Sequence, residues 1–540
     1  MFDLVCKTLS KTRPINFLGT FILVLSLSLS AWPIDEDVSK TKLLTYSEIA
    51  ELYNQINLSP ALGLRLNRLL TEAFVYNQRT SVNPQLSASP ALGEYIRVAQ
   101  WNIQRGLEFD ALKAVFDSEE RTVGYLDAGR YPPESDGRRE LLDQAAMLRS
   151  SDVIILNEAD WGLQRSDYRN IPEELAALLG WNYAFGVEFV ELSPVQRSLD
   201  MRSPDNTAPQ EELDVNRYRG LHGTAILSRF PLENVRLIPY RTQTYNWYED
   251  EKKNVSLLER GRRKLVKEIF LEKALKEVRR GGRNMLIAEI TDPRFPAGKA
   301  TIVATHIESR TSAKNRKLQL KELLETIKPI RTPVIVAGDM NTSGADMTPT
   351  TIERELKKRL GKPEYWVKTG INQILGLGML HDVVSATLTF GRNYSDPTVR
   401  DIPFVMPNEE RDFFSVLKSF RFDDAGSFDF RGEALRSSGV RKNTLANSNE
   451  RDGKGFVTTF RLPRPVKFIG KFKLDWIFIK PVHLFEPTDY EGSYLFAPHF
   501  GRTLDAVNSL IPDKISDHSP IIVDLPLLEP KIKKHLTKTR

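Results

Sequence analysis

Cysteine is nearly absent from this 540-residue sequence, since its one cysteine, Cys6, lies within the first 31 residues. A chain that loses this segment has neither a disulfide bond nor a thiol nucleophile. The seven histidines show no zinc-ligand spacing, so a cation bound through oxygen is a better expectation than zinc. Apart from the N-terminal segment, the sequence has no internal repeat and no low-complexity block.

A large excess of charge of one sign is also lacking. The net charge is +6, with 41% hydrophobic and 27% charged residues, which is the balance of an ordinary globular protein. A weak positive charge is compatible with an anionic substrate but does not require one. The length allows roughly two to four domains or one long α/β domain.

The longest apolar run, residues 15–31, follows the basic residues Lys7, Lys11 and Arg13. A basic flank, an apolar run and small residues at its end are typical of a secretory signal peptide. We therefore expect residues 1–33 to be a signal peptide and the protein to be secreted or periplasmic. A single-pass membrane anchor is the alternative, because about 17 apolar residues is the lower limit for crossing a bilayer.

Residues 34–94 are expected to form a helical extension and a linker. Thr45 and Glu48 have the spacing of a capping box, and Ser59 before Pro60 is a typical start of a second helix. The polar segment 81–94 is interpreted as the linker.

Residues 95–525 show short apolar runs that alternate irregularly with helical patterns. This is typical of an α/β (α+β) domain in which two sheets pack between helices. The predicted strands cover residues 96–101, 153–156, 183–190, 224–227, 285–290, 301–305, 334–337, 476–479 and 521–523, and the clearest helices cover 141–148 and 171–179.

Three insertions and a basic tail stand outside this pattern, near 191–218, 249–280 and 343–460, and at 526–540. The first insertion is expected to be a long loop close to the site. The second has the charge pattern of a solvated amphipathic helix with Leu265, Ile269 and Leu275 inward. A basic surface for nucleic acid or anionic lipid is its alternative, and no role can be inferred for the third insertion.

The segment VIVAGDMNT, residues 334–342, is the most informative part of the sequence. A buried strand runs into Gly338 and then presents Asp339 and Asn341 two residues apart. Because side chains alternate along a strand, we expect the acid and the amide on one face at the end of a sheet. Alone, this pattern is more typical of a capped turn.

Similar polar residues occur at the ends of five other predicted strands. They are Asn102 and Gln104 after 96–101, Glu158 where the run 153–156 stops, His306 after 301–305, Asp475 before 476–479, and Asp517 with His518 before 521–523. Each has a structural explanation when it is taken singly. Together, acids, amides and histidines at strand ends indicate a metal-dependent attack on a phosphate ester.

Phosphate chemistry explains these residue types. Mg²⁺, with Mn²⁺ and Ca²⁺ as alternatives, binds carboxylate oxygens and keeps other positions for water and substrate. Glu158 is expected to be the principal ligand, with Asp517, Asn102 and Gln104 nearby.

The remaining polar residues suit proton transfer and charge stabilisation. An amide such as Asn341 can hold the charge that develops on a phosphoryl oxygen. A histidine held by a carboxylate, as expected for His518 with Asp475, can take the proton from water or stabilise the phosphorane.

Seven segments in order resemble the endonuclease/exonuclease/phosphatase superfamily, the fold of pancreatic-type deoxyribonuclease: WNIQRG, ILNE, GTAILSRFPL, VATHIES, VAGDMNT, KLDWIFI and ISDHSP. The resemblance covers residues 95–525 apart from the insertions. It implies a four-layer sandwich of two mostly antiparallel sheets flanked by helices, and a hydrolase that acts on phosphoester bonds.

The resemblance also implies roles, with Glu158, Asn102 and Asp517 on the metal side and His306, Asp339, Asn341, Asp475 and His518 in catalysis. Asp339 would orient or deprotonate the attacking water, and Asn341 would contact the phosphate. Asp475 would orient His518, and His306 would contact the phosphate or protonate the leaving group.

The sequence departs from the family pattern in two places. Gln104 stands where several members carry an acid, so we expect it, with Arg105, to contact the substrate. The tyrosine often found before the GTAILS segment is not in register here. Tyr218 and His222 are the candidates for its place, and His222 is expected to contact the substrate or to be structural.

The resemblance leaves the substrate open. We expect a phosphodiester, with nucleic acid as the first hypothesis and Arg105, Arg217 and Arg219 at the rim of the site. A sphingomyelinase-like or phosphoinositide-type enzyme is the second, with Trp247 and Trp366 as the candidate membrane contacts. The third hypothesis is a catalytically silent binding protein. We expect a monomer and can infer no protein partner.

Overall fold

The computed structural model of this chain describes residues 42–78, 84–192, 213–252, 277–342, 411–430, 458–466, 469–484 and 492–531. Outside these ranges lie the expected signal segment 1–33, Trp366, most of each insertion with the expected inward residues Leu265, Ile269 and Leu275, and the end of the tail. Within the ranges, no helix is long and apolar enough to cross a membrane.

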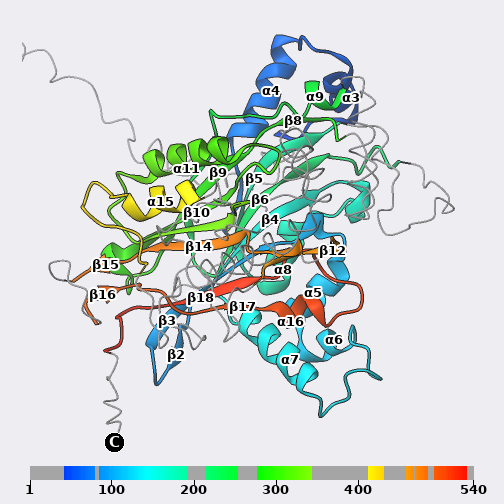
Figure 1. The fold of residues 1–540 in the computed structure, drawn as a ribbon. Coiled ribbons are helices and arrows are strands. Elements are labelled where there is room, and N and C mark those ends of the chain that lie inside the picture. The colour runs from blue at the N-terminus through cyan, green and yellow to red at the C-terminus, as the bar shows by residue number, and fades with distance from the viewer. Residues whose placement is uncertain are drawn as a thin grey trace, which may run out of the picture. The chain divides into compact units, whose positions relative to one another are not determined.

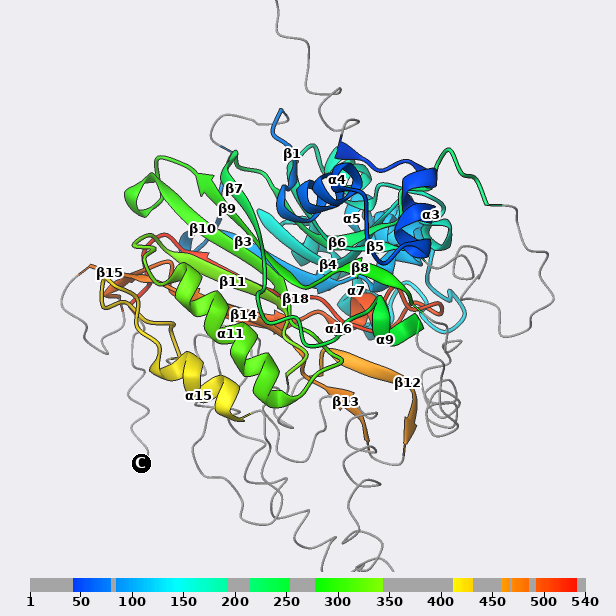
Figure 2. The same ribbon diagram turned by 90° about the horizontal axis from the view of Figure 1, so that it is seen from above.

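Two large sheets form the centre of the fold (Figures 1 and 2). The first has the order β1-β5-β6-β4-β3-β18-β17, with β2 on β3 and β8 on β5. Its strands are β1 (Phe74–Tyr76), β2 (Ser87–Ser89), β3 (Gly93–Asn102), β4 (Val153–Trp161), β5 (Asn182–Glu191), β6 (Leu221–Ser228), β8 (Arg279–Gly281), β17 (His499–Thr503) and β18 (Ile521–Pro526).

The second sheet has the order β14-β11-β10-β9-β7. Its strands are β7 (Leu232–Pro239), β9 (Asn284–Thr291), β10 (Lys299–His306), β11 (Val334–Asp339) and β14 (Asp475–Lys480). In these two sheets, β3 with β4 and β10 with β11 are parallel pairs, and the other described pairs are antiparallel. All nine predicted strands are confirmed.

Strand alternation divides the apolar residues between two cores. In β11, Ile335 and Ala337 belong to the core between the sheets, whereas Val334 and Val336 belong to the core on the other face of the second sheet. Because both faces are buried, the strand is a continuous apolar run in the sequence.

Helices cover the outer face of each sheet. The helices α5 (Phe109–Asp117), α7 (Asp136–Arg149) and α8 (Ile171–Leu179) pack together beside the first sheet, where α8 contacts β4, β5 and β6. On the second sheet, α11 (Ala313–Ile327) contributes Leu320, Leu323 and Ile327 to the outer core. The predicted four-layer sandwich is confirmed, although the sequence analysis missed α5 and α11.

The two helices predicted in the N-terminal extension are present in the structure. The capping box of Thr45 and Glu48 begins α3 (Tyr46–Asn54), and Ser59 with Pro60 begins α4 (Pro60–Thr71). The expected linker is wrong in part, because β2 lies within it and pairs with β3.

The structure also corrects the prediction for the two ends of the second insertion. At one end of the insertion, the described residues form α9 (Glu249–Lys252), and the other end forms β8, which pairs with β5. The expected helix therefore does not extend to Arg280.

The third insertion adds a helix to the outer layer. The helix α15 (Arg411–Ser419) contacts α11, and its Phe413, Phe414 and Leu417 are buried in the outer core. The ring centroid of Phe414 lies 4.7 Å from that of Trp476. This part of the insertion is thus a structural component of the domain (Figure 2).

We predict that Phe414→Ala will lower the free energy of unfolding by about 3–5 kcal/mol, because it opens a cavity between α15 and β14. Urea unfolding followed by tryptophan fluorescence measures the change. Leu318→Ala, at a position of α11 that is 38% exposed, is the control and should cost far less. Equal effects of the two substitutions would show that α15 is not packed as described.

Candidate active site

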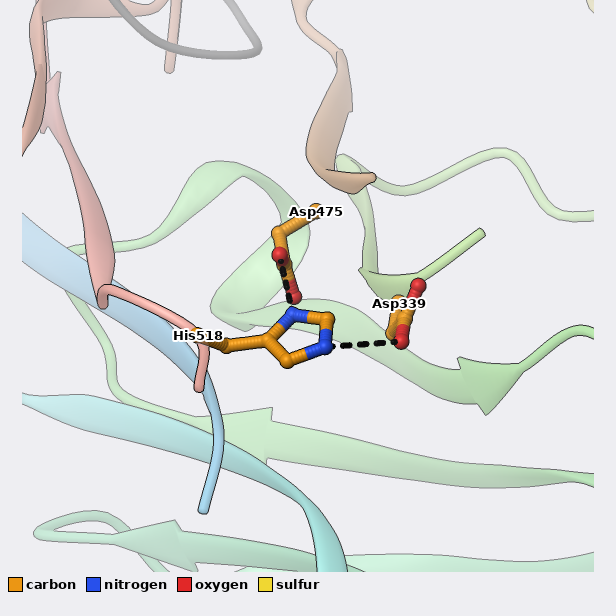
Figure 3. Close-up of side chains that lie close together, drawn as sticks. All are labelled: Asp339, Asp475 and His518. Carbon is orange, nitrogen blue, oxygen red and sulfur yellow. Dashed lines mark hydrogen bonds and ion pairs between the residues drawn. The ribbon is translucent and has the colours of Figure 1, made fainter. Parts of the chain in front are cut away.

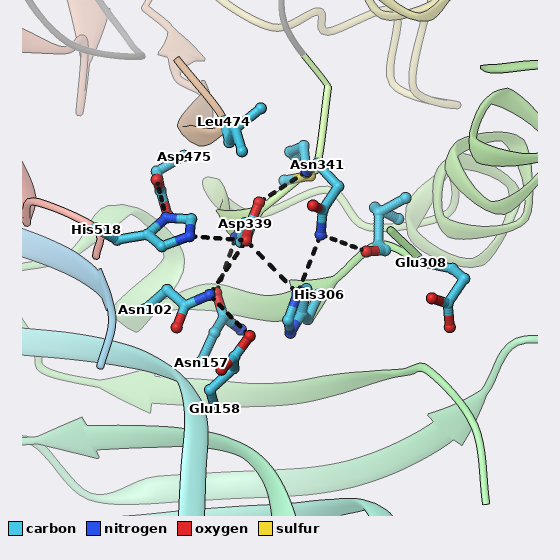
Figure 4. Close-up of polar contacts among 12 residues, drawn as sticks. Asn102, Asn157, Glu158, His306, Glu308, Asp339, Asn341, Leu474, Asp475 and His518 are labelled. Atoms are coloured by element: carbon cyan, nitrogen blue, oxygen red, sulfur yellow. Dashed lines mark hydrogen bonds and ion pairs between the residues drawn. The ribbon is translucent and has the colours of Figure 1, made fainter. Parts of the chain in front are cut away.

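The candidate site lies where strands of both sheets end and their polar side chains converge (Figure 4). Asn102 ends β3 and His306 ends β10, while Asp339 ends β11 and Asp475 begins β14. The strand register places His306 beside Asp339 and Asp339 beside Asp475. The topology therefore brings the predicted catalytic residues into one row.

His518 lies between two carboxylates in this row (Figure 3). Its Nδ1 is 2.7 Å from Asp475 Oδ2, and its Nε2 is 3.7 Å from Asp339 Oδ2. Trp101 Nε1 donates to the carbonyl oxygen of His518 at 2.9 Å, and the Phe460 ring centroid lies 4.8 Å from the imidazole. These contacts fix the orientation of a buried histidine ring.

The two carboxylates set the charge of His518. Burial lowers the pKa of His518, but Asp475 and Asp339 outweigh burial and hold this pKa well above its ordinary value. Burial raises the pKa of Asp339 to about 7, opposed by His518 and assisted by Asp475. At neutral pH, His518 is therefore a cation, and Asp339 titrates in the range that suits a general base.

Ligand atoms of Asp339, Asp475 and His518 lie within 4.8 Å of one another, which is also close enough to hold an ion. A histidine must be neutral to bind a metal, and the raised pKa of His518 opposes this state. We therefore interpret these three residues as a proton-handling group.

Asn102 connects this group to Glu158. Its Nδ2 donates to Asp339 Oδ2 at 3.1 Å and lies 3.3 Å from Glu158 Oε1. Burial raises the pKa of Glu158, but nearby cations, led by Arg105, lower it overall. Glu158 is thus an ionised carboxylate beside the catalytic row.

Asp517 completes an oxygen-rich group around Glu158. Its backbone N–H donates to Gln104 Oε1 at 3.0 Å, and Gln104 N–H donates to Asn102 Oδ1 at 3.1 Å. Burial raises the pKa of Asp517, and Glu158 adds to this rise although His518 opposes it. Two carboxylates that repel each other beside amide oxygens match the ligands of a hard divalent cation, so these residues fit the predicted metal.

His306 and Asn341 lie on the opposite side of Asp339. His306 Nε2 is 3.6 Å from Asp339 Oδ2 and 3.1 Å from Asn341 Nδ2, and its Nδ1 is 2.7 Å from an arginine, Arg283. Burial and then Arg283 hold the pKa of His306 well below its ordinary value. The imidazole of His306 is therefore neutral at neutral pH.

Four predicted site residues have a left-handed backbone: Gln104, Arg105, Glu158 and Asn341 have φ values of 47°, 65°, 55° and 46°. Such conformations cost about 1–3 kcal/mol each and persist only where the surroundings require them. Their concentration at one place supports its assignment as a functional site.

This backbone geometry corrects two expectations. The strand β4 does not stop at Leu156 but continues to Trp161, with a register shift between Leu156 and Ala159 that gives Glu158 its unusual conformation. Asp339 and Asn341 do not share a strand face, because β11 ends at Asp339 and Asn341 has a left-handed backbone. A hydrogen bond of 2.8 Å from Asn341 N–H to Asp339 Oδ1 brings them together instead.

Two buried amides that the sequence analysis missed support the catalytic row. Asn157 Oδ1 accepts from the backbone N–H of Asp339 at 2.8 Å and from Gln100 Nε2 at 3.1 Å. Gln100 Nε2 also lies 3.1 Å from Asp475 Oδ1. A signal was available, since both are polar residues inside apolar strand runs.

Arg105 lies near Glu158 but is not free. Its guanidinium donates to Glu277 at 2.7 Å, and Glu277 also pairs with Arg279. Burial raises the pKa of Glu277, but Arg105 and Arg279 hold it far below its ordinary value. Contact between Arg105 and a substrate phosphate, as predicted, would have to compete with this ion pair.

His222 is 2% exposed and bonds through Nδ1 to Asp160 at 2.8 Å. Although burial raises the pKa of Asp160, Arg165 and His222 hold it at about 2. His222 thus belongs to a buried charge network, and the substrate contact expected for it has no support in this arrangement.

The sequence matches the model of the Endonuclease/Exonuclease/phosphatase family over residues 99–518. No curated protein sequence matches significantly. Similar solved structures include an endonuclease/exonuclease/phosphatase from Beutenbergia cavernae DSM 12333, with 16% identity over 80% of this chain and 72% of that chain and a TM-score of 0.37.

Two further solved structures are similar at the same level. The human Nocturnin catalytic domain with bound sulfate has 15% identity over 80% of this chain and 92% of that chain, with a TM-score of 0.34. D. rerio TDP2 complexed with a single-strand DNA product has 14% identity over 80% and 98% of the two chains, with a TM-score of 0.35. Membership of the family therefore rests on the match of the sequence to the family model.

The pKa of Asp339 predicts a pH-dependent stability in metal-free protein. Between the ordinary value of 3.8 and the folded value of about 7, the folded chain binds more protons than the unfolded chain. Raising the pH through this window therefore favours unfolding. Relative to Asp339→Asn, the wild type should lose stability from about pH 4.5 to about pH 6, where histidines stay mostly protonated in the unfolded chain.

Urea unfolding of both proteins in EDTA at the two pH values measures this effect. A difference between the two unfolding free energies that stays constant, or that shifts towards the wild type with rising pH, would contradict the raised pKa of Asp339.

Proposed function

From the premise that this chain belongs to the endonuclease/exonuclease/phosphatase family, whose members hydrolyse phosphoester bonds, we propose that it is a divalent-metal-dependent phosphodiesterase acting on nucleic acid. The observation that carries the proposal is the convergence of an ionised Glu158 and the Asp339–His518–Asp475 group at one edge of the two sheets. The basic and apolar N-terminal segment supports a secreted or periplasmic location.

The metal side of the site consists of Glu158, Asn102 and Asp517. These residues would hold Mg²⁺, which supplies positive charge to the phosphoryl oxygens when it is bound. Asn102 also donates to Asp339, so the same amide sets the position of the catalytic carboxylate relative to the metal side.

Asp339 is the base in this proposal. With a pKa of about 7, it accepts a proton from water more readily than an ordinary aspartate does. His518 is already protonated and cannot take that proton. It instead places a positive charge beside the phosphorus, and Asp475 holds it in this orientation at 2.7 Å.

Two observations favour nucleic acid over membrane lipid. Arg217 has a side chain that is 52% exposed, and its guanidinium donates to the carbonyl oxygen of Asp167 at 2.6 Å and lies 3.7 Å from the carboxylate of the same residue. Its exposed N–H groups can contact a backbone phosphate. Trp247, a candidate membrane contact, is buried, and the guanidinium groups of Arg279 and Arg310 lie 4.7 and 4.5 Å from its ring centroid. It is therefore unavailable for insertion into a bilayer.

We predict Mg²⁺-dependent nicking of supercoiled plasmid by the purified protein, with a loss of about 10²- to 10⁴-fold in rate for His518→Ala and Asp339→Ala. Leu318→Ala is the folded control. Sphingomyelin vesicles and a phosphoinositide are assayed in parallel. Cleavage of lipid with intact plasmid would reassign the substrate, and no turnover on any of the three would favour a silent binding protein.

Removal of the metal should abolish this activity, and Glu158→Gln should raise the half-saturating Mg²⁺ concentration by at least about tenfold. The reason is that the substitution removes the ionised carboxylate while keeping its shape. Glu120→Gln, at an exposed position of α6 (Glu119–Val123), is the matched control. Equal Mg²⁺ dependence of the two variants would exclude Glu158 as a ligand.

A further inference from the structure

Arg283 contacts the imidazole of His306, the last residue of β10. One of its terminal nitrogens, NH1, lies 2.7 Å from His306 Nδ1, and both side chains are buried. A guanidinium is permanently charged and has only N–H donors. His306 Nδ1 must therefore accept a hydrogen bond from Arg283 through its lone pair. A proton on Nδ1 would point at an N–H group of a cation.

Arg283 is held firmly in this position. The same NH1 donates to Glu188, a buried residue of β5, and Nε lies 3.6 Å from Glu308 Oε2. Glu188 is itself bonded by Thr224 at 2.6 Å. Because every group in this chain of contacts is buried, Arg283 cannot turn away from the imidazole without taking its positive charge away from Glu188 and Glu308.

The other ring nitrogen then carries the single proton of a neutral imidazole. It lies 3.1 Å from Asn341 Nδ2, and this amide also donates to the carbonyl oxygen of Ile307 at 2.9 Å. A proton on Nε2 faces this neutral amide and also the Asp339 carboxylate, whose Oδ2 lies 3.6 Å away, whereas a proton on Nδ1 would face a cation at 2.7 Å, so Nε2 is the favoured position for the proton. His306 Nε2–H and the second N–H of Asn341 are then two adjacent donors. An anionic oxygen is the group that such a pair binds.

We propose that Arg283 is a positioning residue that fixes His306 as the Nε2–H tautomer, so that His306 and Asn341 together donate to one phosphoryl oxygen. The identity of that oxygen rests on the proposed function, whereas the tautomer does not. The proposal chooses between the two roles expected for His306: it contacts the phosphate and does not protonate the leaving group.

The carboxylates around His306 explain why an arginine is needed. Glu188 Oε2 lies 3.8 Å from Nδ1, and Asp339 Oδ2 lies 3.6 Å from Nε2. Without an intervening cation, these two carboxylates would favour the imidazolium, as Asp475 and Asp339 do at His518. Arg283 lies between Glu188 and the ring and reverses this preference, in agreement with the lowered pKa of His306.

The tautomer is tested by long-range ¹H–¹⁵N correlation spectra of the full-length protein labelled with ¹⁵N-histidine, with His306→Asn assigning the signals. The expected result is an Nε2–H signal for His306 with no protonation between about pH 5 and pH 8, where free histidine titrates. An Nδ1–H tautomer, or a ring that titrates near its ordinary pKa, would overturn the proposal. This measurement needs no substrate and no variant of Arg283.

Variants of Arg283 test the positioning role. Arg283→Met keeps the length of the side chain but removes its donors, so His306 should become protonated at neutral pH. Arg283→Lys retains a cation and should keep the ring neutral. The control is Arg279→Met, which removes an arginine that is equally buried and paired but does not contact His306. It should leave the tautomer unchanged.

Steady-state kinetics complete the test, with the substrate that the assays of the proposed function identify. Arg283→Met should lower kcat by about 10²- to 10³-fold with a smaller change in KM. The reason is that an imidazolium at His306, with Nε2 3.6 Å from Asp339 Oδ2, would pair with this carboxylate and lower the pKa of the base. A neutral His306 without any hydrolytic activity would refute the proposed function and leave the tautomer standing. Hydrolysis by a protein whose His306 is an imidazolium would refute the role of Arg283 alone.

Discussion

The pairing of β11 with its two neighbours is the constraint on which the site depends. In this register His306, Asp339 and Asp475 lie side by side on three adjacent strands. The parallel pairing also requires Gly338, since a Cβ at its φ of 154° would lie 1.7 Å from the carbonyl oxygen of Thr305. A single glycine thus allows the close approach that places a histidine and an acid at the same level.

Burial shifts the pKa values of the residues in this row, and charge pairing offsets the free-energy cost of burying them. The same desolvation raises the pKa of Asp339 and lowers that of His306, while nearby carboxylates raise that of His518. Each deviation depends on a partner from a distant part of the chain. The second insertion takes part in this balance, because Glu277 and Arg279 at its end pair with Arg105 and with Glu191.

The sequence analysis located the strands and most of the residues that the fold brings together at the candidate site, because both depend on local patterns. A buried strand requires a run of apolar residues, and the acids and histidines next to such runs stand out. It failed where the backbone departs from regular geometry, as at the bulge that contains Glu158 and the left-handed Asn341. It also missed Arg283, which looks in the sequence like one of many surface arginines.

The sequence by itself therefore determined the layered fold, the family resemblance and the residue types of the site, since periodicity and motif order are properties of neighbouring residues. Only the tertiary structure decided the charge states and the partners. Arg105 meets Glu277 across 172 residues, and Asn102 meets Asp339 across 237. The physical reason is that a buried charge takes its pKa and its orientation from groups that folding brings within a few ångströms, and sequence spacing does not record these groups.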